Sequence, residues 1–204
     1  MFILGLTGPM ASGKSTVAQL FAQAGAVCLD ADALVHRLQQ PGTPQTLAVA
    51  DLLGVHVLDE EGGLDREVLK RHIARDPQVL NLLEEVLIPG VVALLAAQLQ
   101  HAAAQGAKLV VIEAPLLFEY GLHHRCDATA WCDAGADAAQ RAHSRPGMTP
   151  ALLTLLQQRR LPSTEAQKLA THTLATHTGA LAKTTAMVQQ LAQHMLTLPP
   201  QAWP

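Results

Sequence analysis

The stretch GPMASGKS, residues 8–15, is the strongest structural signal in this 204-residue chain. It has the spacing G-x-x-x-x-G-K-[ST]. In this motif the backbone N–H groups of a glycine-rich turn surround phosphate. The lysine reaches the β- and γ-phosphates, and the serine hydroxyl binds Mg²⁺. The flanks agree, because residues 2–6 predict a buried strand and the apolar spacing from Val17 onward predicts a helix. An ordinary strand-to-helix connection with a solvated lysine is the alternative. We interpret the stretch as a phosphate-binding loop, hereafter the P-loop.

The nucleotide contacts expected at the P-loop come from its own residues and the first residue after it. These are Gly8, Pro9, Met10, Ala11, Ser12, Gly13, Lys14, Ser15 and Thr16.

Composition narrows the class of protein. A net charge of −3 argues against a broad nucleic-acid surface, and three cysteines without a C-x-x-C pair argue against a disulfide framework. The histidines form no H-x-x-x-H pair, so we expect no structural zinc. We also expect no signal peptide, no apolar run of spanning length and no membrane partner, and therefore a cytoplasmic protein.

Strand and helix patterns alternate along the chain. Apolar stretches at residues 26–32, 108–117 and 127–133 predict strands, and helical spacing fills most of the sequence between them. Helical spacing from residue 33 to about residue 75 is broken by PGTP and EEGG, and a last helix is expected around residues 181–195. This alternation predicts an α/β fold with a parallel central sheet covered by helices.

Two acids, Asp30 and Asp32, end the second predicted strand. In a doubly wound sheet, the carboxyl end of a strand beside the P-loop strand faces the ligand crevice, and side-chain alternation places both acids on one face. One of them can accept the proton of an attacking hydroxyl, and we choose Asp32 because it lies nearer the strand end. The alternative is that one acid caps the following helix.

Four segments in this order resemble the dephospho-CoA kinases: LTGPMASGKSTVA, DADALVHRLQQPG, EAPLLFE and the two arginines of QRAHSR. The resemblance covers about residues 3–160. It implies a three-layer P-loop kinase fold in one domain, with a helical acceptor-binding region at about residues 33–105 and a helical lid at about residues 138–165. It also implies transfer of the ATP γ-phosphoryl group to the ribose 3′-hydroxyl of dephospho-CoA, the last step of coenzyme A synthesis, with ATP and Mg²⁺.

The resemblance also implies roles for single residues. Thr7, Lys14 and Ser15 belong to the ATP and magnesium site, and Asp32 is the general base. Glu113 holds Mg²⁺ through water, although a solvated strand-end acid is the alternative. Glu119 fits the family segment but suits a structural role equally well. The substrate contacts implied are Thr7, Asp32, Pro89 and Leu116.

Arg141 and Arg145 match the lid arginines of the family. Independently, their i,i+4 spacing places them on one helix face, and guanidinium groups suit phosphoryl oxygens because they stay charged and bond bidentately. A solvated basic helix face is the alternative. Arg159 and Arg160 align with the lid only loosely.

The sequence departs from the family at two places. Ile88 stands where the family commonly has histidine before proline, and residues 171–179 lack the acid and the asparagine found near adenine. We interpret both as changes in binding rather than lost catalysis. A related small-molecule kinase with another acceptor and a non-catalytic nucleotide-binding regulator stay open as alternatives. The expected partners are the small-molecule substrates ATP and dephospho-CoA. The expected oligomeric state is a monomer or a weak homo-oligomer.

Overall fold

The computed structural model describes residues 1–143 and 149–200, and the chain forms two compact units. The first unit contains the P-loop and consists of Met1–Asp30 together with the chain from Gln98 onward. The second unit is Ala31–Ala97. Arg145 lies outside the described residues.

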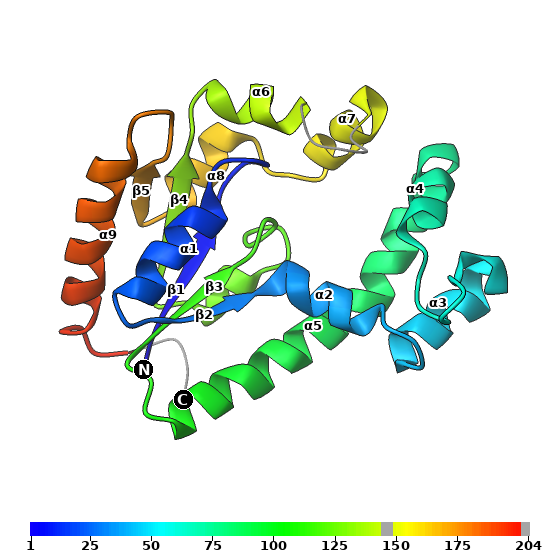
Figure 1. Cartoon of the computed structure of the whole chain (residues 1–204), viewed down its shortest axis with the longest axis horizontal. Helices are drawn as coiled ribbons and strands as arrows, with labels where there is room; N and C mark the ends of the chain where they lie inside the picture. The colour runs from blue at the N-terminus through cyan, green and yellow to red at the C-terminus, as the bar shows by residue number, and fades with distance from the viewer. Residues whose placement is uncertain (144–148, 201–204) are drawn as a thin grey trace. The chain divides into compact units, whose positions relative to one another are not determined.

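A five-stranded parallel sheet forms the centre of the first unit (Figure 1). Its order is β2-β3-β1-β4-β5, so the P-loop strand β1 lies in the middle. This arrangement confirms the predicted α/β fold with a parallel sheet. The strands are β1 (Phe2–Thr7), β2 (Val27–Asp30), β3 (Leu109–Glu113), β4 (Ala128–Asp133) and β5 (His172–Ala175).

Strand β1 is buried along its whole length because both faces of the sheet are covered. Leu4 and Leu6 join one cluster with residues of α1 (Lys14–Gln23) and α9 (Leu181–Met195), the predicted last helix. Gly5 faces the other side, where a Cβ atom would come within 2.7 Å of the Leu117 side chain. The sheet therefore holds the start of the P-loop between two packed layers.

Three short helices follow β4 on the sequence and belong to the region expected to form the lid. On the face of the sheet opposite α1, Trp131 of β4 packs with Phe118 and Ala166. The helices are α6 (Asp137–His143), α7 (Pro150–Gln158) and α8 (Ser163–Leu169). A short 3-10 helix, η2 (Leu122–Arg125), lies between β3 and β4.

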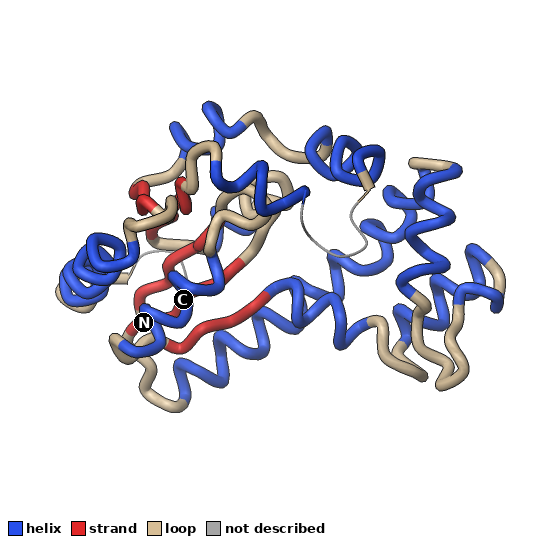
Figure 2. Tube along the Cα trace, turned by 45° about the horizontal axis from the view of Figure 1, so that its top comes forward, coloured by secondary structure: helices blue, strands red, loops and turns tan. Residues whose placement is uncertain are grey.

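The second unit is built from helices and loops, drawn in blue and tan in Figure 2, and all of its residues are described. Thr43 caps α3 by accepting a hydrogen bond from the Thr46 N–H, and Pro44 occupies the first helical position, where no backbone donor is required. The breaks predicted at PGTP and EEGG therefore separate real helices. The elements are α2 (Ala31–Leu38), α3 (Pro44–Leu53), η1 (Val55–Val57), α4 (Arg66–Arg75) and α5 (Gln78–Ala104), which runs on into the first unit.

The expectation that no apolar run reaches membrane-spanning length is wrong. Within the described part of the chain, α5 is 27 residues long and contains an 18-residue window with a mean hydropathy of 2.0, which suffices to cross a membrane by length and composition. The reason is that residues 86–104 contain no Asp, Glu, Lys or Arg. A core helix of a soluble protein passes the same test, so α5 alone does not define a membrane protein.

The prediction that Asp30 and Asp32 share one face of an extended strand is also wrong. Strand β2 ends at Asp30, and α2 begins at Ala31 because Ala31, Leu34 and Leu38 recur at helical spacing and are buried. Asp32 lies in the first turn of this helix, where a carboxylate interacts favourably with the helix dipole. In addition β3, and not β2, lies beside the P-loop strand on this side of the sheet.

Candidate active site

The P-loop connects β1 to α1 through backbone conformations that favour glycine. Gly8 has φ +152° and Gly13, which precedes α1, has φ +83°. A Cβ atom on Gly8 would lie 2.7 Å from the Cys132 carbonyl oxygen on β4. The turn is therefore specified both by backbone conformation and by close packing.

We predict that Gly8→Ala lowers the free energy of unfolding by about 1–3 kcal/mol through backbone strain, with a further loss from the clash with β4, and greatly weakens ATP binding. Calorimetric ATP titration and thermal melting measure both effects. Gly106→Ala is the matched control, because Gly106 also has positive φ (+77°) but open space around its Cβ position. Wild-type ATP affinity in Gly8→Ala would contradict this account of the loop.

Two cationic side chains meet at one backbone carbonyl oxygen of the P-loop. The buried Lys14 donates from Nζ to the oxygen atoms of Gly8 (3.2 Å) and Pro9 (3.0 Å). Arg160, which follows α7, donates from Nη1 to the same Gly8 oxygen at 2.9 Å. Charged N–H donors of this kind form strong hydrogen bonds to phosphate oxygens, so the arrangement suits a polyphosphate.

An oxygen-ligand site lies at the end of β3. The Ser15 hydroxyl donates to Oε1 of Glu113 at 2.9 Å, and Glu113 is the register partner of Leu6 on β1 and of Asp30 on β2. Hydroxyl and carboxylate oxygens are the ligands that Mg²⁺ prefers, and it is commonly held by few carboxylates together with phosphate oxygens. The residues present therefore fit a magnesium ion.

Two buried hydroxyl groups beside the P-loop have no hydrogen-bond partner among the described residues. They are Oγ of Ser12 and Oγ1 of Thr176. A Cβ atom on Gly13 would lie 3.6 Å from the Thr176 Cβ, so the segment after β5 borders the start of α1. Because buried polar groups normally have partners, these atoms indicate polar groups that a bound nucleotide can satisfy.

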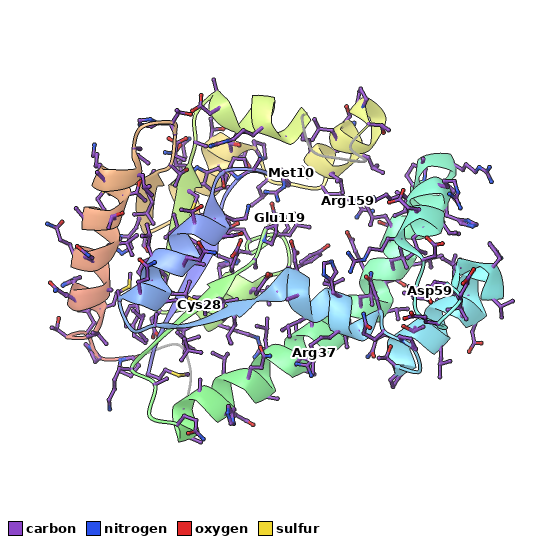
Figure 3. All side chains as sticks on the ribbon, viewed as in Figure 1. Met10, Cys28, Arg37, Asp59, Glu119 and Arg159 are labelled. Carbon is purple, nitrogen blue, oxygen red and sulfur yellow. The ribbon has the colours of Figure 1, made fainter. Side chains whose placement is uncertain are left out.

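A cavity of about 550 Å³ lies next to the P-loop within the first unit, in the size range of ligand pockets. Thr7, Met10, Glu119, Trp131 and Arg160 contribute to its wall. Figure 3 labels Met10 on the P-loop and Glu119 on the turn after β3. Apolar side chains supply most of the remaining lining, so the cavity suits a ligand with an apolar part next to its phosphates.

Glu119 holds the chain where it leaves α7. Its Oε1 accepts a hydrogen bond from the Leu161 N–H at 2.8 Å, directly after Arg160. The same turn also contacts the end of β1, where the Thr7 hydroxyl donates a hydrogen bond to the Pro115 carbonyl oxygen at 3.2 Å. The turn after β3 therefore fixes both the end of β1 and the backbone beside Arg160.

Hydrogen bonding shifts the pKa of Asp137, and burial shifts the pKa of Cys132. The pKa of Asp137 on α6 is lowered by hydrogen bonds from Thr178, with help from Arg141 and His177, and Thr178 N donates to its Oδ2 at 2.7 Å. Burial raises the pKa of Cys132 to about 12. The Cys132 thiol is therefore protonated at neutral pH and does not serve as a nucleophile.

The other predicted residues are distributed over both units. Asp32 is exposed on α2, and Pro89 is exposed within α5, both in the second unit. Leu116 is half-buried in the turn after β3, and Arg141 is exposed on α6.

Sequence reasoning did not identify the Arg160 contact with Gly8 or the unpartnered Thr176 hydroxyl. Arg160 lies 152 residues from Gly8, and no short motif joins them. The only available signal was the loose alignment of Arg160 with the lid.

The comparisons with known proteins converge on one family. Residues 2–181 match the family model described as dephospho-CoA kinase. A dephospho-CoA kinase of Symbiobacterium thermophilum is 40% identical over 152 residues, which cover 74% of this chain and 63% of that protein, slightly less than two thirds of its length. One of Cereibacter sphaeroides is 40% identical over 177 residues, covering 86% of this chain and 87% of that protein.

Solved structures agree on the fold. A Thermus thermophilus crystal structure is similar with a TM-score of 0.74 at 34% identity, covering 94% of this chain and 97% of that one. A dephospho-CoA kinase of Campylobacter jejuni has a TM-score of 0.69 at 18% identity, covering 95% and 96%. Together with the parallel sheet, these likenesses confirm the fold class predicted from the sequence.

Proposed function

Since the chain belongs to the dephospho-CoA kinase family, we propose that it transfers the γ-phosphoryl group of ATP to the ribose 3′-hydroxyl of dephospho-CoA. The family makes it a kinase, and thus a transferase that uses ATP. Magnesium as the metal, dephospho-CoA as this chain's own acceptor and a cytoplasmic setting are parts of the proposal.

One observation supports the proposal most strongly. At one end of β1 the P-loop lies beside two cationic side chains and beside a hydroxyl–carboxylate pair that can bind a metal ion. Lys14 and Arg160 converge on the Gly8 oxygen, and Ser15 contacts Glu113. These are the two kinds of group that phosphoryl transfer requires, since catalysis is mostly positioning and neutralisation of charge on the transferring group.

Each residue then has a stated task. Backbone N–H groups of the P-loop, other than at Pro9, hold the β- and γ-phosphates, and Lys14 exchanges its carbonyl partners for phosphate oxygens. Ser15 and, through water, Glu113 would hold Mg²⁺, which would supply positive charge to compensate the phosphate oxygens. These side chains orient the γ-phosphoryl group and keep its charge compensated.

The acceptor hydroxyl is activated by a carboxylate in this proposal. Asp32 accepts the proton of the ribose 3′-hydroxyl as that oxygen attacks phosphorus, and the leaving group is ADP. Arg141 and Arg160 donate hydrogen bonds to the transferring phosphoryl oxygens, which carry the developing charge. Arg145 keeps the lid role that the sequence predicts.

The proposal is tested by coupled measurement of ADP release from ATP and Mg²⁺ with a panel of acceptors. We expect release with dephospho-CoA and little with nucleosides, nucleoside monophosphates or shikimate. Release with one of the other acceptors alone would identify a kinase with another acceptor. Tight ATP binding without release for any acceptor would indicate a nucleotide-binding regulator.

For Arg160, we predict that substitution by alanine lowers kcat by about 10²-fold, the usual cost of losing one donor to transition-state charge, and changes the KM for ATP less. Steady-state kinetics separate the two effects. Lys168→Ala on α8 is the control, since it removes one exposed positive charge from a neighbouring helix. If Arg160→Ala raises only KM, or matches the control, Arg160 does not act on the transferring group.

A further inference from the structure

Two histidines of the second unit meet through their outer ring nitrogens. His56 lies on η1 and His72 on α4, and their Nε2 atoms are 2.9 Å apart, with ring centroids 4.9 Å apart. Each imidazole is accessible, His56 being exposed and His72 half-buried. The proposed kinase reaction uses neither residue.

The backbone between the two histidines is held in a fixed turn. The Asp65 N–H donates to the Val57 oxygen at 2.8 Å, and Leu58 and Leu64 form an antiparallel bridge. Inside this turn the Asp59 carboxylate accepts from the Gly63 N–H at 2.8 Å. The distance between η1 and the start of α4 is therefore set by hydrogen bonds on both sides of the turn.

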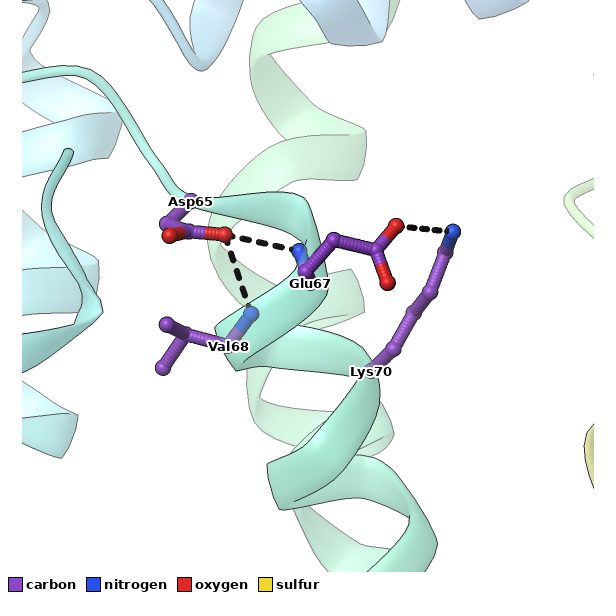
Figure 4. Close-up of polar contacts among 4 residues, drawn as sticks. All are labelled: Asp65, Glu67, Val68 and Lys70. Atoms are coloured by element: carbon purple, nitrogen blue, oxygen red, sulfur yellow. Dashed lines mark hydrogen bonds and ion pairs between the residues drawn. The ribbon is translucent and has the colours of Figure 1, made fainter. Parts of the chain in front are cut away.

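Helix α4 is itself well anchored at its first turn, as Figure 4 shows. Asp65 accepts hydrogen bonds from the N–H groups of Glu67 and Val68, and Lys70 pairs with Glu67 at 2.6 Å. An N-cap of this kind is worth about 0.5–2 kcal/mol. His72 therefore projects from a helix whose start is fixed relative to η1.

The ring of His56 has room beside the backbone before η1. It lies against Gly54, where a Cβ atom would come within 2.8 Å of Nδ1. Gly54 has φ +97°, a conformation that favours glycine, so the sequence provides room for the ring at this position. The two imidazoles therefore approach each other from a hydrogen-bonded backbone turn.

The spacing of the two nitrogens suits one metal ion. With metal–nitrogen bonds of about 2.0–2.1 Å, two nitrogens 2.9 Å apart subtend about 90° at the metal. This is the angle between neighbouring ligands in square-planar and octahedral complexes, the geometries of Cu²⁺ and Ni²⁺, and it is narrower than the tetrahedral angle of zinc. His72 also lies in the last turn of α4, where the helix dipole favours a cation.

We propose that His56 and His72 form a binding site for a divalent transition-metal ion of the Cu²⁺ or Ni²⁺ type. Two cis imidazole nitrogens bind the ion and water completes its coordination. In residues 1–143 and 149–200 no cluster of three or more His, Cys, Asp or Glu side chains suits a metal, so the site is open and exchangeable. Binding requires both Nε2 lone pairs, so each neutral ring carries its proton on Nδ1.

The test is calorimetric titration of the full chain, without a polyhistidine tag, with NiCl₂ and separately with CuCl₂. We expect one ion per chain, and a loss of affinity of about 10²-fold in either His56→Ala or His72→Ala, because each removes one of two linked ligands. His101→Ala, an exposed histidine at the end of α5, is the control and keeps full affinity. The Cu²⁺ EPR spectrum should show coupling to two imidazole nitrogens, reduced to one in each variant.

A simple imidazole–imidazole hydrogen bond gives a different result. The ion then binds with the same affinity to the wild type and to both variants, or not at all, and either outcome overturns the proposal. Circular dichroism confirms that each variant is folded. ATP affinity measured without transition metal should be unchanged in His72→Ala, because the P-loop belongs to the first unit, so the metal titration and the proposed kinase reaction are tested separately.

Discussion

Lys14→Ala is expected to lower the rate of phosphoryl transfer by about 10²–10³-fold, the cost of removing one donor aimed at transition-state charge. The reason is that Lys14 is held at the P-loop by the oxygens of Gly8 and Pro9, where it can exchange these partners for phosphate. Single-turnover ADP formation with saturating ATP measures the chemical step directly.

The fold should survive this substitution. The contacts of Lys14 with the P-loop are to backbone oxygens, and the sheet cluster beneath α1 is formed by other residues such as Val17 and Phe21. A melting temperature near that of the wild type is the required control. Unchanged turnover in a folded Lys14→Ala protein would show that the P-loop assignment is wrong.

Asp32→Asn is expected to reduce kcat by about 10²–10⁴-fold, the usual contribution of a general base. A ribose hydroxyl is a poor nucleophile at neutral pH, and asparagine keeps the shape of the side chain while removing its charge and basicity. A loose transition state reduces the effect, because little proton transfer has occurred when the leaving group departs. Both substrates should still bind.

Asp30→Asn is the matched comparison, since it neutralises an exposed acid two residues earlier. Asp30 ends β2 and is the register partner of Glu113, so we expect a smaller loss, through the surroundings of Glu113. Single-turnover rates of the two variants should be measured in parallel. If Asp30→Asn is the slow variant and Asp32→Asn is nearly normal, the base has been assigned to the wrong residue.

Much of the fold could be predicted because its strongest signals are local. The P-loop with its apolar flanks predicted β1 and α1, and the β-branched run before Glu113 predicted β3, which is buried at nearly every position. Strand β5 was missed because it is short and only Leu174 on it is fully buried, which leaves little apolar pattern. Strand order depends on pairings between distant segments, and for this reason β2 was wrongly placed beside β1.

The site residues could also be predicted where the signal is local. Ser15 and Glu113 were expected to share a metal, and the structure brings them into contact, because Ser15 lies at the start of α1 and Glu113 at the end of β3, two elements whose type the sequence predicts. The error at Asp32 arose from extending a strand pattern past Asp30 into helical spacing. Arg160 reaches the P-loop only through the tertiary path of the chain between β4 and β5, which no local pattern encodes.

The central claim is that this chain phosphorylates the 3′-hydroxyl of dephospho-CoA. The most direct test is to incubate the purified chain with ATP, Mg²⁺ and dephospho-CoA and to identify the product by mass spectrometry and ³¹P NMR. We predict one new phosphate monoester at the ribose 3′ position, formed in equal amount to ADP and about 10²–10³-fold more slowly with Lys14→Ala. ADP formation that is independent of dephospho-CoA, or phosphate found at any other position, would contradict the claim.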